Sequence, residues 1–201
     1  MIVYWNERPT TSQVVSQLPF DVEIPWTVLR GTNAVLAAET VPVRYEISGL
    51  DTLPKTSAPL PVNVNLTIAG QDHGNAPAML NPELAPVEVM GRTGTNTLTD
   101  EDVGLPVRVR VRLFNSSAPP RVGDFLNLMW NGAGPVATYQ VSAGDAAGSV
   151  VFFPNVPWSV VDITSNAVNT VYYTTTNGFN EQRSNPVSVT ARITPLPAPT
   201  A

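Results

Sequence analysis

The chain has 201 residues, a single histidine and no cysteine, which excludes disulfide bonds, cysteine-based zinc sites and metal sites built from several histidines. Its formal net charge of −5, with only 13% charged residues, argues against a nucleic-acid partner, because such partners bind a basic face. Residues 1–20 lack the apolar core of a signal peptide, and no apolar run reaches the length of a transmembrane helix, so we expect no membrane insertion.

Alternating apolar and polar residues predict β-strands along most of the chain. Such alternation buries one face of a strand and leaves the other face in water. Clusters of Gly, Asn, Asp and Pro separate the alternating segments and mark turns. Together these signals predict an all-β fold in which antiparallel sheets pack on each other. The alternating segments are residues 41–48, 62–68, 107–113 and 187–193, with shorter strands expected at 87–90 and 126–130.

The best candidate for a helix is short. Thr99 can cap a turn formed by residues 100–102, whose acidic side chains are favoured at the N-terminus of a helix. A second interpretation is a calcium site, since calcium prefers carboxylate oxygens. Consecutive acids point in different directions, so we favour the capped turn and expect no metal site at these residues.

Several short motifs occur twice in the same order. Trp5-Asn6 near the start recurs as Trp130-Asn131 in the second half of the chain. Three further pairs follow, and they are Pro25-Trp26 with Pro157-Trp158, Val43-Arg44-Tyr45 with Val171-Tyr172-Tyr173, and Ser57-Ala58-Pro59 with Ser184-Asn185-Pro186. We therefore expect two copies of one module that differ by loop insertions.

The first copy lacks an opening. The second copy has a long stretch before its Trp-Asn motif, which includes two expected strands, whereas the first has almost nothing before Trp5. A truncated sandwich leaves unpaired backbone groups and an uncovered apolar face. Either another chain or upstream sequence supplies the missing strands, or residues 1–70 are partly disordered. If the first module is ordered, we expect it to pair with a neighbouring molecule or with residues 71–90. The predicted organisation is an incomplete module at 1–72, a proline-rich linker at 73–86, a complete module at 87–195 and the start of the next linker at 196–201.

The motifs of the second copy follow a recognisable order. They are Leu98-Thr99-Asp100-Glu101-Asp102-Val103-Gly104, Gly123-Asp124, Val156-Pro157-Trp158, Val171-Tyr172-Tyr173 and Ser184-Asn185-Pro186. This order resembles the bacterial Ig-like repeats of large surface proteins of Gram-negative bacteria. The resemblance covers nearly all of the second module and the later part of the first. It implies tandem immunoglobulin-like β-sandwich modules, of which the first is incomplete.

The same resemblance implies a function. It is that of a non-catalytic stalk or adhesive module of a bacterial surface or secreted protein, located outside the cell, with no cofactor and no catalytic residues. Its partners would be neighbouring modules of the same array and a surface glycan. The alternative is a glycan-binding module attached to an enzyme or to a phage tail structure, which exposed tryptophans on one face would favour.

Two groups of side chains are candidates for ligand contact. Arg108, Arg110 and Arg112 alternate with apolar residues and point the same way, and such a positive stripe suits an anionic glycan or phosphate. The stripe also fits a solvated face, or a charged edge that prevents aggregation. Trp26 and Trp158 each follow a proline and suit either sugar stacking or packing in a loop.

Other conspicuous residues are expected to have structural roles. Trp5 and Trp130 each follow an apolar residue on the same face of a strand, so we expect both in the core. His73 lies in the polar segment 71–75. We expect a solvated linker histidine there, and not a general base or metal ligand, because the sequence offers it no partner group.

Overall fold

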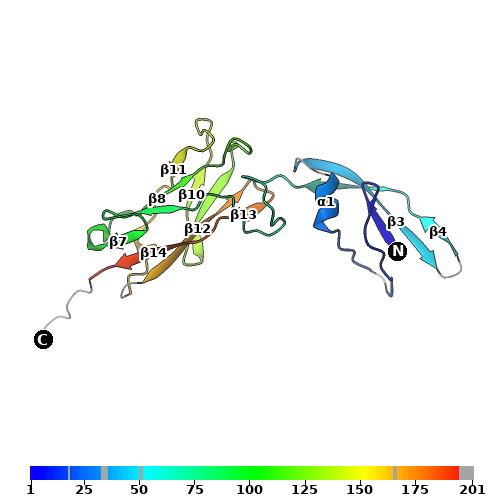
Figure 1. Ribbon diagram of the computed structural model, residues 1–201, viewed down its shortest axis with the longest axis horizontal. Coiled ribbons are helices and arrows are strands. Elements are labelled where there is room, and N and C mark those ends of the chain that lie inside the picture. The colour runs from blue at the N-terminus through cyan, green and yellow to red at the C-terminus, as the bar shows by residue number, and fades with distance from the viewer. Residues whose placement is uncertain (18, 33–35, 50–51, 165–166, 195–201) are drawn as a thin grey trace. The chain divides into compact units, whose positions relative to one another are not determined.

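The chain forms two units of β-structure in the computed structural model, which describes residues 1–17, 19–32, 36–49, 52–164 and 167–194 (Figure 1). Unit 1 is Met1–Thr67 and unit 2 is Ile68–Ala201. Strands predominate over helices among the described elements of both units, so the expected all-β class is confirmed. Of the helices that the structure describes, none is long and apolar enough to span a membrane.

Unit 1 is built on one antiparallel sheet with a long central strand, β3. The hairpin β1–β2 pairs with one edge of β3, and β4 and β5 pair one after the other with its opposite edge. The described elements are β1 (Ile2–Trp5), β2 (Arg8–Pro9), α1 (Trp26–Thr32), β3 (Ala38–Gly49), β4 (Thr52–Thr56) and β5 (Leu60–Asn65).

Unit 2 contains two sheets. The larger has the strand order β10-β9-β12-β14-β7, with β13 also paired to β12, and the smaller has the order β11-β8-β6. The described elements are β6 (Glu88–Met90), β7 (Thr97–Thr99), η1 (Asp100–Asp102), β8 (Arg108–Arg112), β9 (Phe125–Trp130), β10 (Ala133–Gln140), β11 (Val150–Phe152), η2 (Trp158–Val160), β12 (Val168–Thr176), β13 (Glu181–Arg183) and β14 (Val187–Arg192).

The two sheets of unit 2 enclose one hydrophobic core. The smaller sheet contributes the valines that alternate with arginine on β8, and the larger sheet contributes the apolar residues of β9, β12 and β14. Trp130 and Tyr173 are among the largest side chains that are fully buried. The predicted alternation therefore corresponds to one buried and one solvated face on these strands.

The main sheets of the two units share their strand connections. Each contains a hairpin, β1–β2 or β9–β10, whose first strand pairs with the long strand β3 or β12. Trp5 lies opposite Val43 on β3, and Trp130 lies opposite Val171 on β12. Both hairpins turn at an asparagine directly after the tryptophan, with a positive φ of 45° in unit 1 and 49° in unit 2, which suits a two-residue turn.

A serine hydroxyl bonds the other edge of the long strand in the same way in both units. In unit 1 the Tyr45 N–H donates to Ser57 Oγ (3.0 Å), and the Ser57 N–H donates to the Tyr45 carbonyl (2.9 Å). In unit 2 the Tyr173 N–H donates to Ser184 Oγ (3.1 Å), and the Ser184 N–H donates to the Tyr173 carbonyl (2.9 Å). The tyrosines and serines that the sequence matched therefore have matching hydrogen-bond partners.

The main sheets of the two units differ at one buried side-chain amide, which belongs to Asn169 in unit 2. The side-chain oxygen of Asn169 accepts hydrogen bonds from Trp130 Nε1 (2.9 Å) and from the Asp162 N–H (2.8 Å). Its side-chain nitrogen donates to the Asp162 carbonyl (3.1 Å), so the amide joins β9, β12 and the preceding loop. Val41 stands at the matching place in unit 1, and Trp5 Nε1 is buried there with no partner among the described residues.

The structure differs from the sequence expectations at two local points. Helix α1 was not predicted, and it begins where the Pro25 carbonyl accepts hydrogen bonds from the N–H groups of Val28 (2.9 Å) and Leu29 (3.2 Å). Strand β5 ends before the alternating segment does, because the Asn65 side chain accepts the Thr67 N–H (2.9 Å) and turns the chain. The expected helical turn at residues 100–102 is confirmed as η1.

The proline-rich segment at 73–86 takes part in the packing of unit 2. Leu84 is 1% exposed and belongs to the core. The Asn81 N–H donates to the Arg183 carbonyl (2.9 Å), and the Arg183 N–H donates to the Met79 carbonyl (2.8 Å), so this segment pairs with the free edge of β13. The contacts thus divide the chain after Thr67. The linker expected at 196–201 lies outside the described residues.

The Asn169 amide gives a prediction about stability. We expect Asn169→Val, which copies unit 1, to lower the free energy of unfolding of unit 2 by about 2 kcal/mol, because Trp130 Nε1 and the Asp162 N–H lose their buried acceptor. Urea unfolding followed by the NMR signals of unit 2 measures the change. The control is Asn127→Val, since Asn127 bonds the exposed Thr138 hydroxyl (3.0 Å), and an equal effect of both changes would contradict the prediction.

Candidate functional site

The arginine stripe lies on the outward face of β8. Val109 and Val111, which alternate with the arginines, are 0% and 1% exposed and point into the core. Arg108, Arg110 and Arg112 therefore share the opposite face of the strand. β8 is the middle strand of its sheet, with β11 beside it (Figure 1), so the stripe is not a charged edge.

The three arginines have different surroundings. Arg110 Nε donates to the carboxylate of Glu88 on β6 (2.7 Å), which neutralises its charge. Arg112 donates to the Gly148 carbonyl (3.0 Å). The Arg108 guanidinium lies over the ring of Phe152 on β11, at 5.2 Å from the ring centroid, and has no carboxylate partner in the part of the chain that the structure describes. Arg110 is therefore the member of the stripe whose charge a carboxylate neutralises, whereas Arg108 and Arg112 have no carboxylate partner among the described residues.

A hollow of about 490 Å³ brings Arg108 together with Trp158, and we call it the Arg108 hollow. Trp158 begins η2, and it is half-buried because its ring also packs against the core. Arg92 stands on the wall, in the turn between β6 and β7. Met90, Leu98, Leu105, Pro106 and Val107 supply its apolar lining.

Asp102 forms the acidic part of that wall. Its carboxylate accepts hydrogen bonds from the Arg92 N–H (3.0 Å) and the Thr99 N–H (2.8 Å), so it fixes the turn that carries Arg92. These bonds occupy both carboxylate oxygens with backbone donors. The hollow thus offers two guanidinium groups and one aromatic ring to a ligand, an arrangement that suits an anionic group beside a flat apolar surface.

Sequence reasoning named Arg108 and Trp158 but missed Arg92. The signal that was present is the Gly91-Arg92-Thr93-Gly94 turn, since a charged residue between glycines projects from a tight turn. Its distance in sequence from Arg108 and Trp158 hides the relation, which arises when β6, β8 and η2 meet.

Arg110 and Arg112 line a different hollow, of about 350 Å³, with Glu88 and Val150. The carboxylate of Glu88 already binds Arg110 there. The stripe that the sequence indicates as one feature therefore lies in two different hollows, and the Arg108 hollow is the one that also contains Arg92 and Trp158.

The tryptophans differ in their burial and surroundings. Trp5 and Trp130 are 7% and 1% exposed, which confirms their expected place in the core. Trp26 begins α1 in unit 1 and is half-buried. Trp158, and not Trp26, lines the hollow beside Arg108.

The expected solvated state of His73 is wrong. His73 is 8% exposed, because its segment folds onto unit 2, and its Nδ1 is buried with no partner among the described residues. The His73 backbone N–H donates to the Asp72 carboxylate (2.9 Å). Within the described ranges, no group of three or more His, Cys, Asp or Glu side chains lies together to hold a metal ion.

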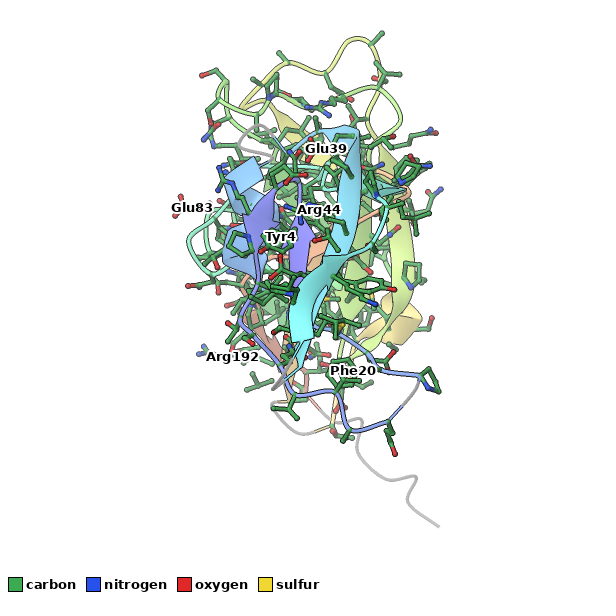
Figure 2. All side chains as sticks on the ribbon, turned by 90° about the vertical axis from the view of Figure 1, so that its right-hand side faces the viewer. Tyr4, Phe20, Glu39, Arg44, Glu83 and Arg192 are labelled. Atoms are coloured by element: carbon green, nitrogen blue, oxygen red, sulfur yellow. The ribbon has the colours of Figure 1, made fainter. Side chains whose placement is uncertain are left out.

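Unit 1 carries a charged cluster on the outer face of its sheet. Arg44 lies over the ring of Tyr4, at 3.9 Å from the ring centroid, and Figure 2 shows the two side by side. Arg44 also donates to the Glu7 carboxylate (2.8 Å). This hydrogen bond lowers the pKa of Glu7 from its ordinary value. Both charges are compensated, so the cluster leaves no free group for a ligand.

Comparison of the chain with protein-family models, with curated proteins and with solved structures gives no match. The argument for function therefore rests on the geometry of the residues described above.

Asp102 gives a prediction about the wall of the Arg108 hollow. We expect Asp102→Ala to lower the free energy of unfolding of unit 2 by about 1–2 kcal/mol, because the Thr99 and Arg92 N–H groups lose their acceptor. Thermal unfolding measures the change. Glu101→Ala is the control, since Glu101 is the exposed acid next to it, and a similar loss in both variants would contradict the role of Asp102.

Proposed function

We propose that the chain is a non-catalytic structural and adhesive protein, made of tandem immunoglobulin-like β-sandwich modules of which the first is incomplete. Its place would be the surface of a bacterium or its surroundings. The observation that carries the proposal is the sheet plan common to both units, in which the matched tyrosines and serines have matching hydrogen-bond partners and the matched tryptophans lie opposite matching valines. Successive modules of one plan are typical of extended arrays.

The start of unit 2 supports a mechanical role. Met79 and Asn81 exchange backbone hydrogen bonds with Arg183, and the Asn81 side chain donates to the Gln182 side chain (2.9 Å) and to the Gln71 carbonyl (2.7 Å). We call these five residues the N-terminal clamp. Leu80 and Arg183 pair in parallel, so a force entering at the start of the unit loads several of these hydrogen bonds before it reaches the core.

The clamp gives the experiment that tests this function. When the chain is pulled between its ends by atomic-force microscopy, we expect unit 2 to resist with a distinct unfolding force, and Asn81→Ala to lower that force because it removes buried side-chain bonds. Asn127→Ala is the matched control, since its hydrogen bond to Thr138 lies away from the clamp. Extension of unit 2 without a force peak would contradict the mechanical proposal.

The Arg108 hollow favours the second candidate, a glycan-binding module. Two guanidinium groups with no carboxylate partner among the described residues, Arg92 and Arg108, stand beside the ring of Trp158. Sugars stack on aromatic rings, and guanidinium groups bind the carboxylates or sulfates of acidic sugars in a fork geometry. An acidic glycan is therefore the ligand class that fits this place. Such binding would also serve an adhesive module.

Glycan binding can be measured directly. We expect the chain to bind oligosaccharides that contain uronic acid or sulfate, and Arg108→Gln to weaken that binding about tenfold through loss of a charge-assisted hydrogen bond. Arg112→Gln, on the same strand but outside the hollow, should leave binding unchanged. Equal losses in the two variants would point to general surface charge and contradict a site at the Arg108 hollow.

A further inference from the structure

Part of the inner face of the unit 1 sheet is exposed where the matching face in unit 2 is buried. Tyr45 and Ile47 on β3 are 46% and 48% exposed. Tyr173 and Thr175, at the matching places on β12, are both 0% exposed. Leu53 and Leu60 add apolar surface with 86% and 65% exposure. We call the surface formed by Tyr45, Ile47, Leu53 and Lys55 the open face, and a hollow of about 400 Å³ lies on it.

In unit 2 the chain itself occupies the corresponding region. The Thr175 hydroxyl donates to the Ala69 carbonyl (2.7 Å). Further along, residues 79–81 pair with the edge of β13 at Arg183, and the Asn81 side chain bonds that of Gln182. The segment at the start of unit 2 thus bonds the inner face of its sheet at Ala69 and, after a series of turns, the adjoining edge at residues 79–81.

The matching edge in unit 1 is the outer edge of β4, and its backbone groups at Thr56 are available for the same pairing. Ser57, like Ser184, donates its N–H inward to the long strand. Because backbone groups alternate along a strand, the N–H and C=O of Thr56 point away from β3, as those of Arg183 point away from β12. Among the described residues, none bonds these two groups of Thr56. Pro54, two residues before Thr56, has no N–H to donate at this edge. In unit 2 the corresponding pairing uses the backbone of a single residue of β13, Arg183, so Thr56 alone can support the same pairing.

Among its described residues, unit 1 also lacks a strand that corresponds to β11, which agrees with an uncovered sheet face. In unit 2, β11 is a strand because it pairs with β8. When the match of Pro25-Trp26 with Pro157-Trp158 is extended back along the chain, Phe20 aligns with Phe152 on β11, but the described residues 19–25 of unit 1 form no strand. A strand needs a neighbour for its backbone groups, so a segment without the partner sheet stays irregular.

The residues of the open face indicate what it would accept. Lys55 lies opposite Ile47, as Gln182 lies opposite Thr175. Gln182 accepts a hydrogen bond from the Asn81 amide, whereas the Lys55 ammonium group only donates and is positively charged, so a carboxylate at the position of Asn81 would complement Lys55 better than the neutral amide. Ile47 stands where unit 2 has the hydroxyl group of Thr175, so this position favours contact with an apolar side chain. The segment at 68–84 of a second copy carries the amide and is a poorer fit.

We propose that the open face of unit 1 binds an extended segment of another polypeptide, which pairs with the backbone of Thr56, covers Tyr45 and Ile47 with apolar side chains and presents a carboxylate to Lys55. This is addition of a strand to a free sheet edge, in which main-chain bonds supply affinity and the side-chain contacts supply selectivity. The inference is independent of the proposed mechanical and glycan-binding roles, because the surface that would bind the segment contains none of the residues of the clamp or the Arg108 hollow.

The test uses dye-labelled peptides that copy residues 68–89, one natural and one with Asn81→Asp, bound to the full chain and followed by fluorescence anisotropy. We expect the Asn81→Asp peptide to bind about threefold more tightly than the natural one, the size of an exposed ion pair. Lys55→Glu in the full chain should reverse this order. Absence of binding by both peptides, or an order that Lys55→Glu leaves unchanged, would overturn the proposal.

A second variant distinguishes pairing with the strand edge from nonspecific binding to the apolar surface. Thr56→Pro removes the outward N–H without breaking a bond to β3, and proline is tolerated where a strand faces solvent. We expect it to weaken peptide binding about tenfold while the NMR spectrum of unit 1 stays folded. Unchanged binding would place the peptide elsewhere and overturn the proposal. Self-association of the full chain that Thr56→Pro abolishes would identify a second copy as the occupant, and would overturn the choice of a separate partner.

Discussion

The apolar face of each main sheet has to be covered, and this requirement governs the rest of the molecule. An antiparallel sheet with alternating side chains gains its stability from one buried face. In unit 2 the smaller sheet meets the larger across a core that contains Val109, Val111, Leu128 and Tyr173, all at most 1% exposed. The outward side chains of β8 are then free to be charged, and for this reason the arginines of the stripe reach solvent together.

Unit 1 has the same long strand with the same edge partners, but no second sheet among its described elements. Its face is covered near Trp5, Val3 and Val41, which are at most 9% exposed, and is open near Tyr45 and Ile47. The buried amide of Asn169 also has no counterpart, so Trp5 Nε1 is left without the bond that Trp130 Nε1 makes. The first difference follows from the absence of a second sheet among the described elements of unit 1, and the second from Val41 standing where unit 2 has Asn169.

The strands could be predicted because their signal is local. Alternation indicated β3, β8 and β14, and the acids after Thr99 indicated η1. Helix α1 has no comparable signal, since its few residues include Gly31 and the β-branched Val28 and carry no clear periodicity. The burial of His73 could not be predicted from the local sequence either. A polar segment is expected to be solvated unless the surface against which it packs is known.

The candidate site shows the same limit. The sequence by itself determined the all-β class, the face shared by the three arginines and the burial of Trp5 and Trp130, because neighbours along a strand alternate by a fixed geometry. The tertiary structure alone decided that Arg92, Arg108 and Trp158 meet at one hollow, that Glu88 neutralises Arg110, and that residues 79–81 cover an edge of unit 2. These contacts join segments far apart in the chain, and their distances depend on how the sheets pack rather than on any local pattern.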